Sequence, residues 1–141
     1  MIKYFYSLYY FYVDTIGNNQ SLQIGYFSCK NNAIIAKEQI KDKPGFKNSG
    51  GNFEIQKIGV VFSKEISNQK NIILYELSHE YTDNDGYDNF VIFGIYATYE
   101  EAEQVKKSNE KLSPFKYFPN DFCISECKVD VYGWQEGFTS W

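Results

Sequence analysis

The chain has 141 residues and a net charge of −4, and 19% of its residues are aromatic. This length suits one compact domain or two very small ones, and the aromatic content excludes an intrinsically disordered chain. No apolar run approaches the roughly 18 residues that span a bilayer, and the N-terminal residues do not resemble a secretory leader. The chain also lacks the cluster of basic residues that nucleic-acid binding needs. Composition therefore predicts a soluble, globular protein of the cytoplasm.

The sequence contains an internal repeat. Shifting the chain against itself by 69 positions, without a gap, aligns many residues of the same type. The identical pairs include Tyr6 with Tyr75, Leu8 with Leu77, Tyr12 with Tyr81, Asp14 with Asp83, Gly17 with Gly86, and Phe46 with Phe115. Self-similarity at a fixed offset indicates a duplicated unit. We therefore predict two repeats, residues 1–66 and 71–141, joined by the polar stretch 67–70 and forming two small domains or one compact domain.

The first repeat is expected to run strand, strand, helix, strand. Ser28 is the expected cap of the helix, because a serine hydroxyl can accept a hydrogen bond from a free amide of the first turn. Pro44 and Gly45 should end the helix. The expected helix face consists of Ala33, Ala36 and Ile40.

The second repeat shows the same pattern with clearer signals. Its expected elements are a strand at 72–81, a turn at 83–86, and strands at 90–96 and 122–129. Thr98 and Glu101 form a capping box that begins a helix, which continues to Leu112 and ends before Pro114.

Together the repeats predict an α+β fold of two pseudo-twofold ββαβ units, with about six mainly antiparallel strands and two helices. The first strand should lie centrally in each unit. A right-handed crossover should carry the third strand to its far side.

The repeat also predicts which face of each first strand is buried, because strand side chains alternate. The shared face carries Leu8 and Leu77 and should pack on the helices. The opposite face of the second repeat suits solvent and consists of Leu74, Glu76, Ser78 and Glu80. That of the first repeat is more apolar and consists of Phe5, Ser7, Tyr9, Phe11 and Val13. An exposed apolar face usually marks an interaction surface, and the alternatives are packing of the two sheets together or a homodimer.

Few residues offer catalytic chemistry. The cysteines are Cys29, Cys123 and Cys127, which form no zinc-type pair. About 13 Å of strand separates the last two, which is too far for a disulfide. We expect free thiols that are buried or half-buried. His79 is the only histidine that could activate a thiol, and we expect a structural or surface histidine instead.

One turn resembles part of a calcium site. Residues 83–88 are similar to the start of an EF-hand loop, in which alternating oxygens wrap the ion. Placing Gly86 at the loop glycine puts Tyr81 and Ile92 at ligand positions, where neither side chain can bind calcium. We therefore predict a solvated hairpin turn, with no metal and no cofactor.

Several short segments of the second repeat form a specific combination. They are residues 74–77, 79–81, 93–96, 100–102, 114–115, 122–124 and the Trp-Gln-Glu-Gly-Phe tail at 134–138. On these segments the chain resembles a small bacterial domain family of unknown function, over most of residues 72–138. The first repeat resembles it more loosely, since it keeps residues 24–27 and 44–46 but lacks the tail. The resemblance implies no activity, cofactor or catalytic residue.

Two functions fit these observations, and an enzyme is disfavoured because no acid–base pair accompanies a glycine-rich or metal-ligand motif. The first is a non-enzymatic protein-binding module, specifically a bacterial immunity protein that occludes a cognate toxin such as a nuclease. The second is a small-molecule-binding or regulatory sensor with an aromatic-lined cleft between the repeats. Candidate partner-binding residues are Phe5, Tyr9, Phe11, Asp83, Asp85, Asp88, Trp134 and Trp141. Alternatively, Trp134 closes the core of the second repeat.

Overall fold

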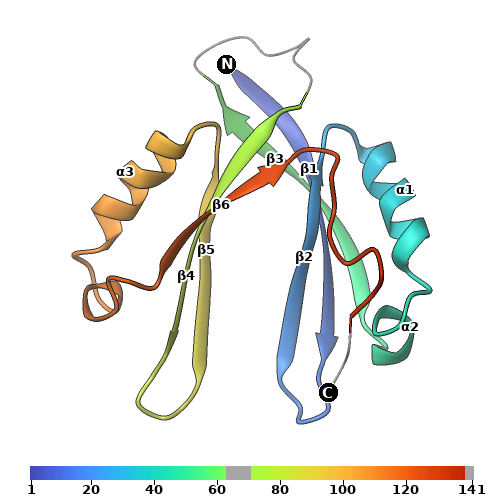
Figure 1. The fold of residues 1–141 in the computed structure, drawn as a ribbon, viewed down its shortest axis with the longest axis horizontal. Helices are drawn as coiled ribbons and strands as arrows, with labels where there is room; N and C mark the ends of the chain where they lie inside the picture. The colour runs from blue at the N-terminus through green and yellow to red at the C-terminus, as the bar shows by residue number, and fades with distance from the viewer. Residues whose placement is uncertain (63–70, 139–141) are drawn as a thin grey trace. The chain divides into compact units, whose positions relative to one another are not determined.

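The structure is a computed structural model that describes residues 1–62 and 71–138 (Figure 1). The linker 67–70 lies outside the described residues. The first repeat consists of β1 (Ile2–Val13), β2 (Asn19–Phe27), α1 (Lys30–Ile40), the short α2 (Phe46–Ser49) and β3 (Asn52–Val61). The second repeat consists of β4 (Ile73–Thr82), β5 (Asp88–Tyr96), α3 (Tyr99–Asn109), the short 3-10 helix η1 (Phe115–Tyr117) and β6 (Phe122–Lys128).

Both repeats have the predicted α+β architecture. The six strands form two antiparallel three-stranded sheets, in the orders β2-β1-β3 and β5-β4-β6. The first strand of each repeat, β1 or β4, is therefore central, as predicted. Aromatic and β-branched residues dominate β1 and favour its extended backbone. No helix among the described residues is long and apolar enough to cross a bilayer.

A β-bulge occurs at the same place in both repeats. Ile24 is the extra residue of β2 and Phe93 is the extra residue of β5, each opposite the middle of the central strand. An extra residue resets the alternation of side chains, so that Ile24 and Phe27 can both face the helix. Both residues belong to the core. Positions 24 and 93 are equivalent in the repeat, so the bulge belongs to the repeated unit.

The cores lie between the central strands and the main helices. Leu8 and Leu77 are both fully buried, which confirms the predicted face. The core around α1 consists of Leu8, Tyr10, Ile24, Phe27, Ala33, Ala36, Ile40 and Phe46. It includes all three predicted residues of the helix face. The opposite face is less exposed than predicted, because Leu74 and Ser78 are buried.

The two compact units of the structure do not follow the repeat boundary. One unit contains Met1 and residues from Val60 to Cys127, and the other contains Ile2–Gly59 together with the chain from Lys128 onward. Each repeat therefore contributes its C-terminal segment to the unit built mainly from the other repeat. We call residues 128–138 the tail.

The tail pairs with the edge of β2 through one antiparallel bridge and two flanking hydrogen bonds. The backbone N–H of Asp130 donates to the carbonyl of Tyr26 at 2.8 Å, and that of Gly133 donates to the carbonyl of Ile24 at 3.0 Å. Tyr132 lies between these contacts and forms an isolated antiparallel bridge with β2. The tail therefore satisfies backbone groups of a strand edge that would otherwise stay open.

The end of the tail packs against the loop before α2. The backbone N–H of Phe138 donates to the carbonyl of Pro44 at 3.0 Å, and its ring centroid lies 4.9 Å from that of Phe46 and 5.1 Å from that of Tyr12. Gly45 has a φ of 89°, and a Cβ there would collide with the Phe138 carbonyl. Pro44 and Gly45, predicted only as the end of a helix, therefore also form the docking site of the tail.

The predicted cap of α1 is wrong. Cys29 is the N-cap residue, and its side chain makes no capping hydrogen bond. Ser28 instead binds the tail, because its N–H and its hydroxyl donate to the Asp130 carboxylate at 2.9 and 2.7 Å. The Ser28 hydroxyl, which we expected to cap α1, therefore binds Asp130 of the distant tail instead.

The Thr98 part of the predicted capping box of α3 is confirmed, whereas the predicted end of the helix is wrong. Oγ1 of Thr98 accepts from the backbone N–H of Glu101 at 3.2 Å. The helix ends at Asn109 instead of Leu112. The side chain of Asn109 donates to the carbonyl of Val105 at 2.8 Å, and beyond it Leu112 N–H donates to the Asn109 carbonyl in a tighter turn.

Candidate functional site

Negative charge is concentrated in one part of the second repeat. Between Asn71 and Val105 the sequence has eight carboxylates and neither lysine nor arginine. These carboxylates are Glu76, Glu80, Asp83, Asp85, Asp88, Glu100, Glu101 and Glu103. Five of them lie on the β4–β5 hairpin, whose turn end projects past α3 and β6 (Figure 1). The modest net charge of −4 does not show this uneven distribution of charge, although it can be read from the sequence alone.

Asp83 holds the turn of this hairpin together. Its Oδ1 accepts from the backbone N–H groups of Asp85 and Tyr87, both at 3.0 Å, and its Oδ2 accepts from the Asn89 side chain at 3.1 Å. These hydrogen bonds, with that from Asn89 the strongest influence, hold the pKa of the Asp83 carboxyl below its usual value. Asp14 makes the equivalent bonds in the first repeat. Asp83 therefore serves the turn more than it serves a partner.

The backbone of this turn has the predicted hairpin form. Asp83 N–H donates to the Tyr87 carbonyl at 2.9 Å, and Gly86 N–H donates to the Asp83 carbonyl at 3.0 Å. Gly86 has a φ of 83°, a conformation that glycine adopts without strain. Among the residues that the structure describes, no three His, Cys, Asp or Glu side chains are grouped to hold a metal ion.

The other predicted acidic residues lie on the hairpin surface. Asp88 begins β5 and accepts from the Thr82 hydroxyl at 2.7 Å. Asp85 is exposed in the turn, and Glu80 is exposed on β4. We call Glu80, Asp85 and Asp88 the acidic rim.

Strand β5 and Tyr87, the turn residue before it, expose apolar side chains beside the acidic rim. The exposed fractions are 69% for Tyr87, 57% for Phe90, 40% for Val91 and 43% for Ile92. Phe90 and Ile92 pair with Glu80 and Ser78, on the sheet face opposite to Leu77. The equivalent residues of β2, Ser21 and Gln23, are polar. An apolar surface bordered by charge is typical of an interaction site, and our sequence analysis did not select these residues.

The aromatic candidates of β1 have different surroundings. Phe5 is fully buried, so it cannot be the exposed anchor that we predicted. The hydroxyl of Tyr9 donates to Oε2 of Glu54 at 2.7 Å, and this hydrogen bond raises the pKa of Tyr9. Phe11 is exposed, and its ring packs edge-on against Tyr9 at a centroid distance of 4.8 Å. Among the predicted candidates on β1, Phe11 is therefore the exposed aromatic side chain.

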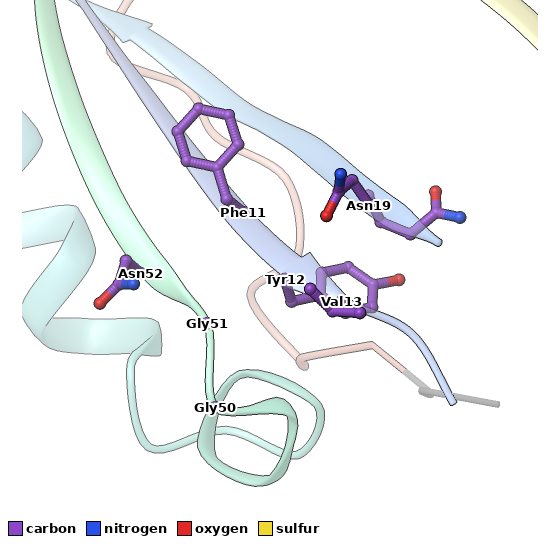
Figure 2. Close-up of a pocket in the computed structure, with 8 residues that line it drawn as sticks. Phe11, Tyr12, Val13, Asn19, Gly50, Gly51 and Asn52 are labelled. Carbon is purple, nitrogen blue, oxygen red and sulfur yellow. The ribbon is translucent and has the colours of Figure 1, made fainter. Parts of the chain in front are cut away.

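An open hollow of about 470 Å³ lies beside Phe11 (Figure 2). It is lined by Phe11, Tyr12 and Val13 of β1, by Asn19 and Gln20 of β2, and by Gly50, Gly51 and Asn52. A Cβ at Gly51 would collide with the carbonyl oxygen of Phe11, so glycine is needed for this close approach. The lining combines an apolar floor with amide side chains, which can receive a small ligand or one side chain of a partner.

Trp134 contacts β2 through the tail. Its indole Nε1 donates to the carbonyl of Gln23 at 3.2 Å, and its ring meets Phe138 edge-on at a centroid distance of 6.1 Å. The alternative that it closes the core of the second repeat is therefore wrong. Part of the indole remains exposed. Trp141 lies outside the described residues.

His79 is a structural histidine. It is fully buried, its Nε2 lies 2.9 Å from the carbonyl oxygen of Phe118, and its ring packs edge-on against Phe122. The equivalent residue of the first repeat, Tyr10, donates its hydroxyl to the carbonyl of Phe46 at 3.0 Å. In both repeats, a buried polar side chain of the central strand thus binds the backbone of the segment that follows the helix.

The cysteines are free thiols. Cys29 and Cys123 are exposed, contrary to our prediction, and Cys127 is half-buried. Burial, with a smaller contribution from Glu76, raises the pKa of the Cys127 thiol to about 11. Cys127 is therefore protonated at neutral pH, which makes it a weak nucleophile.

Comparison with known proteins finds no matching family model, curated protein or solved structure. The resemblance to a small bacterial domain family therefore stays a prediction from the segments quoted above.

Proposed function

We propose that the protein is a non-enzymatic protein-binding module, specifically an immunity protein that neutralises a cognate toxin by covering it. One observation carries the proposal: the exposed Phe90 and Ile92 of β5 lie beside the acidic rim on a hairpin without lysine or arginine. The buried His79 and the protonated Cys127 support a binding role, because neither is placed for acid–base or nucleophilic chemistry.

This surface combines the two components of a fast and selective interface. Carboxylates accelerate the encounter with a basic partner, and salt weakens this effect. Exposed apolar side chains then hold the complex, since each Å² of apolar surface removed from water contributes about 25 cal/mol. A toxin that cleaves nucleic acid needs a basic surface for its substrate. An acidic hairpin that covers this surface would block substrate access.

The test uses the toxin candidate encoded beside the gene for this protein. Co-expression should protect the cell, and the two proteins should copurify. The double variant Asp85→Lys, Asp88→Lys should slow association about tenfold, with a smaller effect at high salt. The matched control is Asp42→Lys with Glu136→Lys, which makes the same charge change at exposed sites of the other unit.

The two charge reversals leave Asp83 intact, because its hydrogen bonds hold the turn. If no neighbouring toxin binds and expression protects no cell, the immunity function is wrong. If the control variant slows association as much as the rim variant does, the hairpin is not the binding surface.

The hollow beside Phe11 favours a second candidate function, the small-molecule sensor, although residues of the first repeat alone line it and our predicted cleft lay between the repeats. Its volume of about 470 Å³ suits a small ligand, which would raise the melting temperature by binding the folded chain alone. In that case Phe11→Ala should abolish the increase, whereas the rim variant should retain it.

A further inference from the structure

The outer edge of β5 presents unpaired backbone groups. β5 is the last strand in its sheet order, so its side away from β4 is an edge. The hydrogen bond from Asp83 N–H to the Tyr87 carbonyl closes the hairpin. In an antiparallel ladder, residue pairs with and without mutual hydrogen bonds alternate, so the pair Thr82–Asp88 that follows has none. The N–H and C=O groups of Asp88, Phe90 and Ile92 therefore point away from β4. Within residues 1–62 and 71–138, no backbone group pairs with them.

The equivalent edge of the first repeat is occupied by the chain itself. There the tail forms an isolated antiparallel bridge with β2 and donates hydrogen bonds to the carbonyls of Ile24 and Tyr26. Both residues are buried, with exposed fractions of 3% and 4%. Their equivalents on β5, Phe93 and Ile95, are only half-buried. The tail thus fills the β2 edge at residues 24–26, whereas the equivalent positions 93–95 of β5 and the adjoining positions 88–92 form an open edge.

We propose that the edge of β5 binds an extended segment of a basic protein as an additional β-strand. The proposal rests on the proposed function, and it identifies how the toxin would be held. Backbone hydrogen bonds to the edge would supply affinity, as in other cases of strand addition. Side chains on the added strand would lie beside Phe90 and Ile92 as cross-strand neighbours.

The carboxylates beside the β5 edge favour a positively charged strand as the binding partner. Glu80 and Asp88 lie on the same sheet face as Phe90 and Ile92, and residues 71–105 contain neither lysine nor arginine to oppose a cationic partner. A strand with apolar residues in its middle and lysine or arginine at its ends, all on one face, therefore complements the edge. An acidic strand would be repelled by the same carboxylates.

A synthetic peptide provides a probe that does not depend on the toxin. Acetyl-Lys-Thr-Val-Thr-Val-Thr-Lys-amide places its lysines and valines on one face of a strand. Added to the full chain, it should shift and protect the amide protons of Phe90 and Ile92 in NMR, and leave that of Val91, already bonded to β4, unchanged. The control peptide has glutamate in place of both lysines and should give no protection. Absence of protection at Phe90 and Ile92, or equal protection by both peptides, would overturn the proposal.

Two variants of Phe90 distinguish the contribution of its backbone N–H to peptide binding from that of its side chain. Phe90→Pro removes the outward N–H and is tolerated on an edge strand, whereas Phe90→Ala keeps the N–H and removes the same side chain. We expect proline to weaken peptide binding at least tenfold and alanine to weaken it less than threefold. Equal losses would refute backbone pairing. Ile92→Pro and Ile92→Ala repeat the comparison at a second outward position, and melting temperatures show which variants remain folded.

The same variants distinguish this proposal from the immunity function. A toxin that binds the Phe90→Pro and Phe90→Ala variants equally well would refute the edge and leave the immunity function standing. A peptide that protects the edge, in a protein that binds no neighbouring toxin, would support the edge and refute the immunity function.

Discussion

Leu8 and Leu77 occupy the same position in the two repeats, and both are fully buried beneath a helix. Replacing either leucine by alanine removes apolar contacts and leaves a cavity that the packed surroundings fill only in part. We expect each variant to lower the free energy of unfolding by about 2–5 kcal/mol, measured by urea denaturation. A loss below about 0.5 kcal/mol would be typical of a surface position and would contradict the assignment of the buried face.

Asp83 links the stability of the fold to pH. Hydrogen bonds keep the pKa of its carboxyl lower in the folded chain than in the unfolded chain. The stability that Asp83 contributes is therefore present above its unfolded pKa of about 3.9 and is lost as the pH falls through the folded value. Asp83→Asn should remove this contribution, so acidification should destabilise the variant less than the wild type in urea titrations. Asp14→Asn should act alike in the first repeat, and parallel pH profiles would contradict both assignments.

At the scale of single elements, the two main helices differ in how they begin. Thr98 caps α3 through its hydroxyl, whereas Cys29 caps α1 without a side-chain hydrogen bond. Thr98→Ala should therefore cost about 1 kcal/mol, and Cys29→Thr should stabilise the chain by about 0.5–1 kcal/mol. Cys29→Ala is the control that removes the thiol without adding a hydroxyl. Thermal unfolding checks all three, and a threonine variant no more stable than the alanine variant would contradict the prediction.

The sequence predicted the strands and helices of the repeat better than it predicted the helix caps and the burial of single side chains. The apolar alternation that contains Leu8 and Leu77 was enough to place both central strands. The same repeat also equates Cys29 with Thr98 and so contains the correct cap of α1, which we missed because Ser28 is the better capping residue. The burial of Phe5 was not predictable, because alternation shows which residues share a face and not what covers that face.

At the scale of the whole molecule, the C-terminal segment of each repeat belongs to the unit built mainly from the other repeat, an exchange that the internal repeat does not reveal. Self-similarity shows that residues 71–141 resemble residues 1–66, but it does not show which unit each C-terminal segment completes. The exchange depends on contacts remote in sequence, such as Ser28 with Asp130 and Pro44 with Phe138. The exchange also explains why the edges of β2 and β5 differ, because the tail donates hydrogen bonds to the edge of β2.

The exchange makes an asymmetric prediction for Phe138, whose ring contacts Tyr10, Tyr12 and Phe46 of the first repeat. Phe138→Ala should destabilise the unit that contains β1, by about 1–3 kcal/mol because the side chain is only half-buried. Amide hydrogen exchange should accelerate at Leu8 and change little at Leu77.

Phe115→Ala is the matched control for this experiment. The Phe115 ring is also half-buried, but it contacts His79, Phe93 and Phe122 of the second repeat. This variant should accelerate exchange at Leu77 and leave Leu8 nearly unchanged, because local opening is confined to the unit that has lost contacts. If Phe138→Ala instead loosened Leu77 more than Leu8, the tail would pack on its own repeat, and the exchanged arrangement would be wrong.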